Sequence, residues 1–166
     1  MPDAGRLFDE HHQSLYRYLV RFSGDADLAA DAVQEAFLRL VERPPPDVGG
    51  ARAWLFKVAT NVVLESARTR SRRLRLLAAS PARAPVGDAP RSPADLVESD
   101  EQRRLVGEAL ASLSDKERTA LLMREEGFSH REIAEAVGTT TGSVGTLVAR
   151  ALARLADELA LDRDDV

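Results

Sequence analysis

The chain of 166 residues contains no cysteine, which excludes a disulfide framework and a metal site built on thiolates. Lysine is almost absent, since every basic residue other than Lys57 and Lys116 is an arginine. No apolar run approaches the roughly 20 residues that span a bilayer, and the N-terminus lacks the apolar core of a signal peptide. We therefore expect a cytoplasmic protein.

Strand signals are also scarce, because no alternating run of apolar and polar residues is bounded by hairpin turns. The composition, with 30% charged and 44% hydrophobic residues, is typical of a globular protein. The formal net charge of −4 argues against a protein that coats nucleic acid indiscriminately. It does not exclude DNA binding through a local basic surface. The sequence predicts an all-α fold.

The segment from Ser129 to Leu155 predicts two short helices joined by a tight turn. Ser129 followed three residues later by Glu132 is a capping-box pattern, which marks a helix start. Gly138 comes where the chain needs a left-handed turn, and apolar residues then recur at three- and four-residue steps. Helix, glycine turn and helix in this order are typical of the helix-turn-helix of DNA-binding proteins. An ordinary helical hairpin is the alternative.

Proline and glycine divide the rest of the chain into further helices and a linker. Residues 77–93 are rich in Ala, Pro, Gly, Ser and Arg without periodicity, which predicts a flexible linker. We therefore expect two small helical domains, residues 1–76 and 94–166. Helices are expected from about Gly5 to Phe22, Asp25 to Glu42, from Ala51 onward, Ala94 to Leu113, and from Ser114 to Gly127.

Several polar residues could bind partners. Thr140, Thr141 and Ser143 stand at a predicted helix N-terminus, where amides and hydroxyls bind phosphate. Arg150 and Arg154 follow one turn apart and can contact phosphates or guanine, although a solvated helix face is the alternative. In the first domain, a helix with Trp54 and Phe56 ends in an arginine-rich run that suits opened DNA. The run consists of Arg68, Arg70, Arg72, Arg73 and Arg75.

Taken in their order along the chain, these predicted helical segments resemble a bacterial RNA polymerase sigma factor of the extracytoplasmic-function (ECF) group of the sigma-70 family. DLAADAVQEAFLRL at 27–40 is similar to region 2.2, which grips a coiled coil of the polymerase β′ subunit. Residues 51–68 resemble regions 2.3 and 2.4, which bind and help to open the minus-10 element. The stretch from LSDKERTALL through the predicted helix-turn-helix resembles region 4, which binds the polymerase β flap and reads the minus-35 element.

The resemblance implies a role for specific residues. It implies polymerase contacts by Asp31, Gln34 and Glu35, minus-10 contacts by Lys57, Asn61 and Arg68, and minus-35 contacts by Thr141, Ser143, Thr146 and Arg150. The loop from Pro44 to Gly50 corresponds to the loop that pockets the base flipped out of the minus-10 element. The implied partners are core RNA polymerase, promoter DNA and an anti-sigma factor, with no cofactor and no catalytic activity.

The chain departs from the family at the recognition helix. The family usually has two basic residues after the motif that matches Gly142 to Val144, and here those positions are Gly145 and Leu147. A glycine within a helix costs about 1 kcal/mol relative to alanine. We therefore expect minus-35 recognition to be weaker or altered, and to depend on Thr146 and Arg150.

Two other functions are considered. A transcription regulator with a helix-turn-helix would bind an operator without replacing the sigma subunit, but it would leave the polar residues from Asp31 to Glu35 unexplained. An enzyme is suggested only by His11 and His12 beside Asp9 and Glu10. Adjacent histidines on a helix point about 100° apart, so they make a poor chelating pair.

Overall fold

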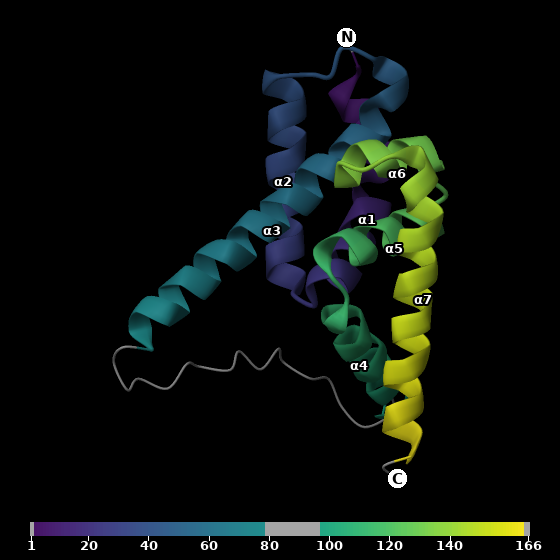
Figure 1. The fold of residues 1–166 in the computed structure, drawn as a ribbon. Coiled ribbons are helices and arrows are strands. Elements are labelled where there is room, and N and C mark those ends of the chain that lie inside the picture. Colours follow the sequence, from purple (N-terminus) through teal and green to yellow (C-terminus); the bar gives the residue numbers. More distant parts are fainter. Residues whose placement is uncertain (1, 79–96, 165–166) are drawn as a thin grey trace.

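The computed structural model describes residues 2–78 and 97–164, and these form seven α-helices and one short 3-10 helix, with no strand among them (Figure 1). The all-α fold is therefore confirmed. The helices are α1 (Ala4–Ser23), α2 (Ala26–Glu42), η1 (Val48–Gly50), α3 (Ala51–Leu77), α4 (Val97–Ser112), α5 (Asp115–Glu125), α6 (His130–Val137) and α7 (Thr141–Asp164). Of the predicted linker, residues 79–93 lie outside the described residues, as do residues 94–96 of the helix predicted to follow it.

Local side-chain caps explain where the helices begin. The Asp25 carboxylate accepts a hydrogen bond from the Leu28 amide at 3.0 Å and so caps α2. The predicted capping box at Ser129 with Glu132 is present in full, and Ser114 with Glu117 forms a second one. Gly138 ends α6 in the left-handed conformation at φ 71°, which a side chain would resist.

The first half of the chain is a bundle of α1, α2 and α3 around an apolar core. Alanines of α2 and α3 are fully buried where these helices cross, and leucines of α1 fill the space beside them. The buried Tyr18 hydroxyl lies 2.9 Å from Thr60 Oγ1, whose hydroxyl donates to the Phe56 carbonyl at 2.6 Å. Burial raises the pKa of the Tyr18 hydroxyl above its ordinary value. The core residues here include Leu15, Leu19, Ala32, Ala36, Leu55 and Ala59.

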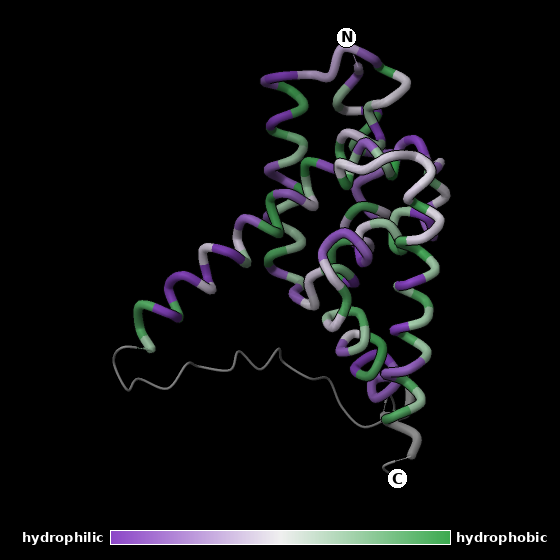
Figure 2. The backbone as a smooth tube through the Cα atoms, viewed as in Figure 1, coloured by the Kyte–Doolittle hydropathy of each residue, from purple (hydrophilic) through white to green (hydrophobic). Residues whose placement is uncertain are grey.

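The C-terminal part of α3 extends beyond this bundle. Every residue from Ala67 to Ala78 is exposed, and Figure 1 shows this end of α3 projecting away from the other helices. The predicted arginine run lies on this projecting arm, which is mostly hydrophilic and ends in apolar residues (Figure 2). The arginines are therefore held apart from the core and are open to solvent.

The second half contains the predicted helix-turn-helix. Ala134 of α6 and Val144 of α7 are 4% and 0% exposed, so the small residue allows the helices to cross closely and the valine fills the angle between them. The two predicted helices therefore pack against each other as a helix-turn-helix requires. Helices α4 and α5 also pack against α7. Helix α7 continues to Asp164, beyond the end at Leu155 that the apolar spacing predicted.

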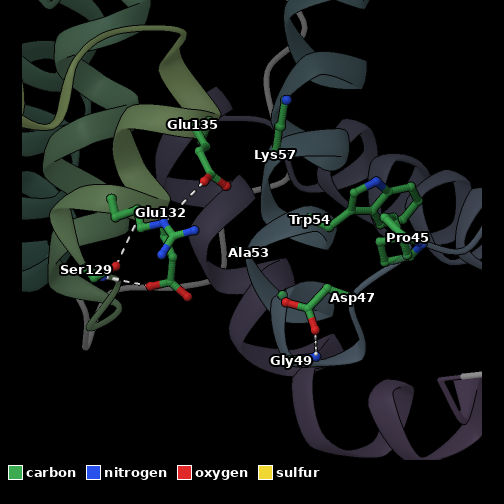
Figure 3. A pocket seen from close by; sticks show the side chains of 13 residues that line it. Pro45, Asp47, Gly49, Ala53, Trp54, Lys57, Ser129, Glu132 and Glu135 are labelled. Carbon is green, nitrogen blue, oxygen red and sulfur yellow. Dashed lines mark hydrogen bonds and ion pairs between the residues drawn. The ribbon is translucent and has the colours of Figure 1, made fainter.

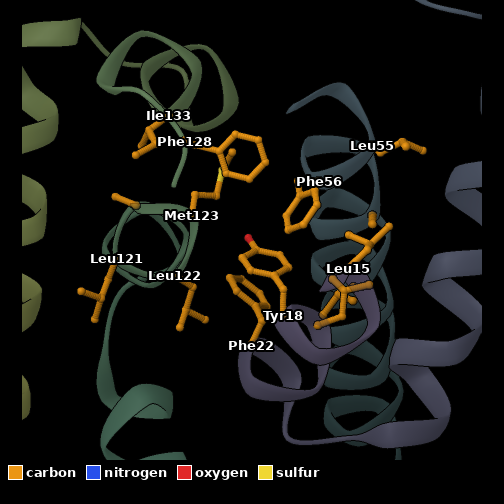
Figure 4. Packing of buried hydrophobic residues seen from close by; sticks show 14 of the residues in the cluster. Leu15, Tyr18, Phe22, Leu55, Phe56, Leu121, Leu122, Met123, Phe128 and Ile133 are labelled. Carbon is orange, nitrogen blue, oxygen red and sulfur yellow. The ribbon is translucent and has the colours of Figure 1, made fainter. Parts of the chain in front are cut away.

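The two halves share one hydrophobic core. Their buried residues form a single contiguous cluster, and Figure 4 shows Tyr18 and Phe56 of the first half facing Met123 and Phe128 of the second. The rings of Phe56 and Phe128 lie 4.8 Å apart at an edge-to-face angle of 65°. The division into two helical units stays a prediction, and in this structure the two halves are docked against each other.

Candidate nucleic-acid interface

Helix α2 presents the polar face that the sequence predicted for binding a partner. Asp31 and Gln34 are exposed, while Glu35 is half-exposed and its carboxylate accepts from Arg39 Nε at 2.7 Å. Asp31, Glu35 and Arg39 line one side of a groove of about 790 Å³ between α2 and α3. Arg68 and other arginines of α3 line its other side. The groove therefore places acidic and basic side chains opposite each other.

The three residues predicted to contact the minus-10 element lie on one face of α3. Lys57, Asn61 and Arg68 are all exposed, and their spacing of four and seven residues keeps them within about 40° around the helix axis. The structure thus brings these three together along one helix. Arg68 also borders the groove with Asp31 and Glu35, so the two predicted surfaces are adjacent.

A second cleft, of about 640 Å³, opens beside Trp54 (Figure 3). Its first wall contains Trp54, Lys57 and the Pro45–Asp47 stretch of the loop before α3. Asp47, the loop's hydrogen-bonding side chain, accepts from the Gly49 amide at 3.0 Å and caps η1. The opposite wall comes from the second half of the chain, namely Ser129, Arg131, Glu132, Glu135 and Ala136.

The exposed face at the start of α7 consists of small side chains. Gly142, Thr146 and Ala149 are exposed and share this face, and Arg150 stands at its edge. Thr141 is exposed at the first turn. Ser143 is half-buried, and its hydroxyl lies 2.7 Å from that of Thr140. The four predicted minus-35 residues are therefore within the first three turns of α7, where small side chains let another surface approach the backbone.

The two unusual positions of α7 have different surroundings. Gly145 is exposed, and a Cβ atom built there would meet no heavy atom within 4 Å. Leu147 is only partly exposed and packs against the hydrophobic core. A basic side chain is therefore missing from the surface at Gly145, whereas Leu147 contributes to the packing of α7.

Arg154 lies one turn beyond Arg150, but its guanidinium forms an ion pair within the protein. Its Nη1 atom lies 3.2 Å from Oε2 of Glu117, whose side chain is only 11% exposed and belongs to the capping box of α5. Arg154 thus joins α7 to the start of α5. Arg150, by contrast, is exposed and has no ion pair among those that the structure describes.

The adjacent histidines His11 and His12 make contacts within the protein that do not indicate a metal site. The His12 ring stacks on Phe8 with centroids 4.4 Å apart, and its Nδ1 lies 2.6 Å from the Phe8 carbonyl oxygen. Burial and the nearby Arg52 lower the pKa of the His11 imidazole, against the opposing effect of Glu10. Among the residues that the structure describes, no group of three or more His, Asp or Glu is placed to hold a metal ion.

Comparisons with known proteins decide the family. The Sigma-70 region 2 family model matches residues 7–73, and the Sigma-70, region 4 model matches residues 103–155. The ECF RNA polymerase sigma factor SigL of Mycobacterium tuberculosis is 37% identical over 167 residues, which cover 95% of this chain and 90% of SigL. The chain belongs to the ECF group of the sigma-70 family. It is an alternative sigma factor that directs transcription initiation.

Other similar proteins support the assignment of this chain to the sigma factors. The ECF RNA polymerase sigma factor SigE of Mycolicibacterium smegmatis is 31% identical over 165 residues, covering 96% of this chain and 63% of SigE. The sigma factor RpoE, solved with the anti-sigma factor NepR from Bartonella quintana, matches with a TM-score of 0.72 at 24% identity, over 96% of this chain and 98% of RpoE. CnrH, solved with the cytosolic domain of CnrY, matches with a TM-score of 0.68 at 21% identity, over 96% and 88% of the two chains. These two structures support the fold.

No helix within the described parts of the chain is long and apolar enough to cross a membrane.

The contacts between the two halves of the sigma factor are features that its sequence did not reveal. Arg52, Glu126 and Phe128 connect the two halves, yet no local motif marks any of them. An arginine in a helix and a phenylalanine after a glycine are too common to signal an interface. Only the packing of distant segments identifies them.

Proposed function

We propose that this sigma factor holds core RNA polymerase through α2 and contacts the promoter through α3 and α7. The exposed polar face of α2 carries the proposal, because Asp31 and Gln34 have solvent-facing side chains beside a charged groove. Exposed polar residues are ordinary on a helix surface, so the region 2 match at residues 7–73 is what supports a binding role for this face. Asp31, Gln34 and Glu35 would bind the coiled coil of the polymerase β′ subunit.

The second part of the proposal concerns the minus-10 element. Lys57 and Arg68 would contact the DNA backbone, and Asn61 would lie near the flipped base. Extruding a base costs a few kcal/mol, so contacts in a preformed cleft must offset the lost stacking. Trp54 at the edge of the cleft offers an aromatic face, which suits an unstacked base.

The third part concerns the minus-35 element, which α7 would read. Thr141 and Ser143 would use hydroxyls and helix N-terminal amides for phosphate, while Thr146 and Arg150 would face base edges or the backbone. The small side chains at Gly142 and Ala149 would let this helix approach the groove closely. The second half, proposed as residues 94–166, would also bind the polymerase β flap, and the first, residues 1–76, would contain the other two surfaces.

We also propose an anti-sigma factor as a partner and the cytoplasm as the location of this protein. The sigma factors of the two similar structures were solved with NepR and with CnrY, which supports a partner of this kind. A sigma factor acts through polymerase, so we infer that this chain has no catalytic activity of its own. A regulator that only carries a helix-turn-helix would not explain the region 2 match at residues 7–73.

Run-off transcription with purified core polymerase tests the proposal. The chain alone should programme core to start at specific promoters, whereas a regulator would need another sigma factor. Gln34→Ala should weaken binding to core roughly tenfold, as expected when a side chain at the centre of an interface is truncated. Gln13→Ala is a matched control, since Gln13 is an exposed glutamine on α1. Equal affinity of the Gln34→Ala variant and the wild type for core would contradict the placement of the polymerase surface on α2.

A further inference from the structure

Arg154 forms an ion pair that joins α7 to the start of α5. Its Nη1 atom lies 3.2 Å from Oε2 of Glu117, a residue 37 positions earlier in the chain. The Glu117 side chain is only 11% exposed, so solvent screens this pair less than a pair between two surface residues. Arg154 follows Arg150 by four residues, which places both arginines on the same side of α7. Arg154 therefore stands at the end of the face proposed to read DNA, but its charge pairs with α5.

The carboxylate that pairs with Arg154 has a fixed orientation. The same Oε2 atom of Glu117 accepts a hydrogen bond from the Ser114 amide at 3.2 Å, and the Glu117 amide donates to Ser114 Oγ at 3.2 Å. These two hydrogen bonds are the capping box of α5. Because this carboxylate cannot move without breaking the cap, Arg154 is joined to a defined point of α5 and not to a mobile surface side chain.

The packing of α7 against its neighbours is largely apolar. Val144, Val148 and Ala151 are buried on the side of α7 that packs against the other helices, of which α5 is one (Figure 1). Apolar burial has no preferred direction, whereas a charge-assisted hydrogen bond holds two atoms at a defined distance and angle. We therefore expect Arg154 to define the rotation of α7 about its axis more sharply than the apolar side chains do.

The orientation of α7 matters because the proposed DNA contacts are few. At 1.5 Å per residue, Arg150 is about 6 Å and Thr146 about 12 Å from Arg154 along the helix axis. Gly145 and Leu147 stand at positions that are usually basic in the family, so fewer ionic contacts are available to offset a misplaced helix. Side chains that recognise a ligand must be held within about 0.5 Å and 10–20° of the binding geometry. A small rotation of α7 should therefore weaken recognition.

We propose that Arg154 is a positioning residue, which acts through Glu117 to orient α7 so that Thr146 and Arg150 meet the minus-35 element. This inference rests on the proposed reading of that element by α7. Arg154 contributes to promoter selection without touching DNA. In this respect it differs from a solvated arginine, which has no effect on selection, and from an arginine that binds a phosphate through its own charge.

Binding of the holoenzyme to promoter DNA tests this role. Two duplexes are compared, namely a promoter mapped by run-off transcription and the same promoter with its minus-35 element replaced. The ratio of the two affinities measures minus-35 recognition, and the dependence of binding on salt reports the number of phosphate contacts. Arg154→Ala should lower the ratio roughly three- to fivefold, the range that loss of one half-exposed ion pair permits, with the salt slope of the wild type. A ratio equal to that of the wild type, or a slope reduced by about 1, would overturn the proposal.

Glu117→Gln separates the ion pair from the helix cap. Glutamine serves at the same position of a capping box, so this variant removes the charge and keeps the cap. It should lower the ratio as Arg154→Ala does. The double variant should lower the ratio no further, because both substitutions remove the same interaction. Additive effects would mean that Arg154 acts independently of Glu117, which contradicts a positioning role.

Arg6→Glu is the control for charge, because Arg6 is 75% exposed and pairs only with Glu10 of its own helix in the ion pairs described. This variant changes the net charge by more than Arg154→Ala does, yet it should keep the ratio of the wild type. A lowered ratio would attribute the effect to net charge and overturn the proposal. Thr146→Ala and Arg150→Ala report on the proposed function itself. If neither lowers the ratio, α7 does not read the minus-35 element; if either lowers it and Arg154→Ala does not, only the positioning role fails.

Discussion

Arg150 and Arg154 lie one turn apart on α7, yet their surroundings predict different roles. Arg150 is exposed beside the small face of the helix, whereas Arg154 pairs with the nearly buried Glu117. Arg150→Ala should therefore reduce transcription from promoters that depend on the minus-35 element, with no loss of stability. If Arg150 binds a phosphate, the substitution should also reduce the salt slope of DNA binding by about 1.

Arg154→Ala provides the matched comparison. It should lower the free energy of unfolding by about 0.5–1 kcal/mol, since the pair is half-exposed and its attraction is partly screened. Urea unfolding of both variants, beside run-off transcription, separates the two effects. If the Arg154→Ala variant lost minus-35 activity at full stability while Arg150→Ala retained it, our placement of the DNA-reading face of α7 would be wrong.

His11 gives the sigma factor a predicted dependence of stability on pH. Burial and Arg52 lower the pKa of its imidazole below the ordinary 6.5, while Glu10 partly opposes them. The unfolded chain then binds the proton more readily than the folded one, so stability falls as pH drops below about 6.5. Thermal unfolding followed by circular dichroism should show a smaller fall in Tm for His11→Gln than for the wild type. Parallel pH profiles would contradict this.

At the scale of single residues, the sequence predicted which side chains are exposed better than it predicted which side chains form ion pairs. Asp31, Gln34, Lys57 and Asn61 are exposed as a binding role requires, because helical spacing places them opposite the apolar stripe. The ion pair of Arg154 with Glu117 joins residues 37 positions apart. Spacing within one helix carries no information about such a pair.

Helix α7 contains the departure from the family pattern at Gly145 and Leu147. Gly145 faces solvent with open space around it, and its backbone is helical. Gly145→Ala should raise the free energy of unfolding by up to about 1 kcal/mol, because it restricts the unfolded chain without a clash. Urea denaturation measures this change. A destabilised variant would show that the glycine has a conformational role within the folded helix.

Gly145→Arg then tests whether the missing cation matters for DNA. The new side chain would lie on the exposed surface of α7, and its pairing with one phosphate should steepen the salt dependence of binding to minus-35 DNA by about 1 in slope. Gly145→Ala serves as its control for helix stability. An equal slope for the two variants would show that this side of α7 does not face the backbone. Leu147 is less suitable, because it packs against the core.

Element boundaries were largely predictable because they depend on local chemistry. Asp25, Ser114 and Ser129 cap helices through hydrogen bonds to residues three positions away, and Gly138 takes its left-handed conformation within one turn. Where a helix boundary depends on packing with other elements, the sequence did not predict it. The end of α7 at Asp164 lies beyond the predicted Leu155, since α4 packs beside this helix and no proline or glycine follows to stop it.

At the scale of the whole molecule, the docking of the two halves was not predictable from the sequence. The composition of residues 77–93 indicated a linker and hence separate units, but it says nothing about affinity between them. The interactions that decide it join residues 70 or more positions apart, such as the Arg52 side chain and the Glu126 carbonyl. Each half is also small, so packing between the halves adds apolar burial to two cores of limited size.

A shared core predicts cooperative unfolding. Because Phe56 and Phe128 bury one another, unfolding of either half exposes apolar surface of the other, so the wild type should unfold in a single thermal transition. Phe128→Ala removes a ring that is 5% exposed and should cost about 3 kcal/mol or more, mainly by uncoupling the halves. Calorimetry of this variant should resolve two transitions of lower enthalpy, whereas Arg6→Glu should keep one. A single transition in the Phe128→Ala variant, with van't Hoff and calorimetric enthalpies equal, would mean that the halves remain coupled without this ring.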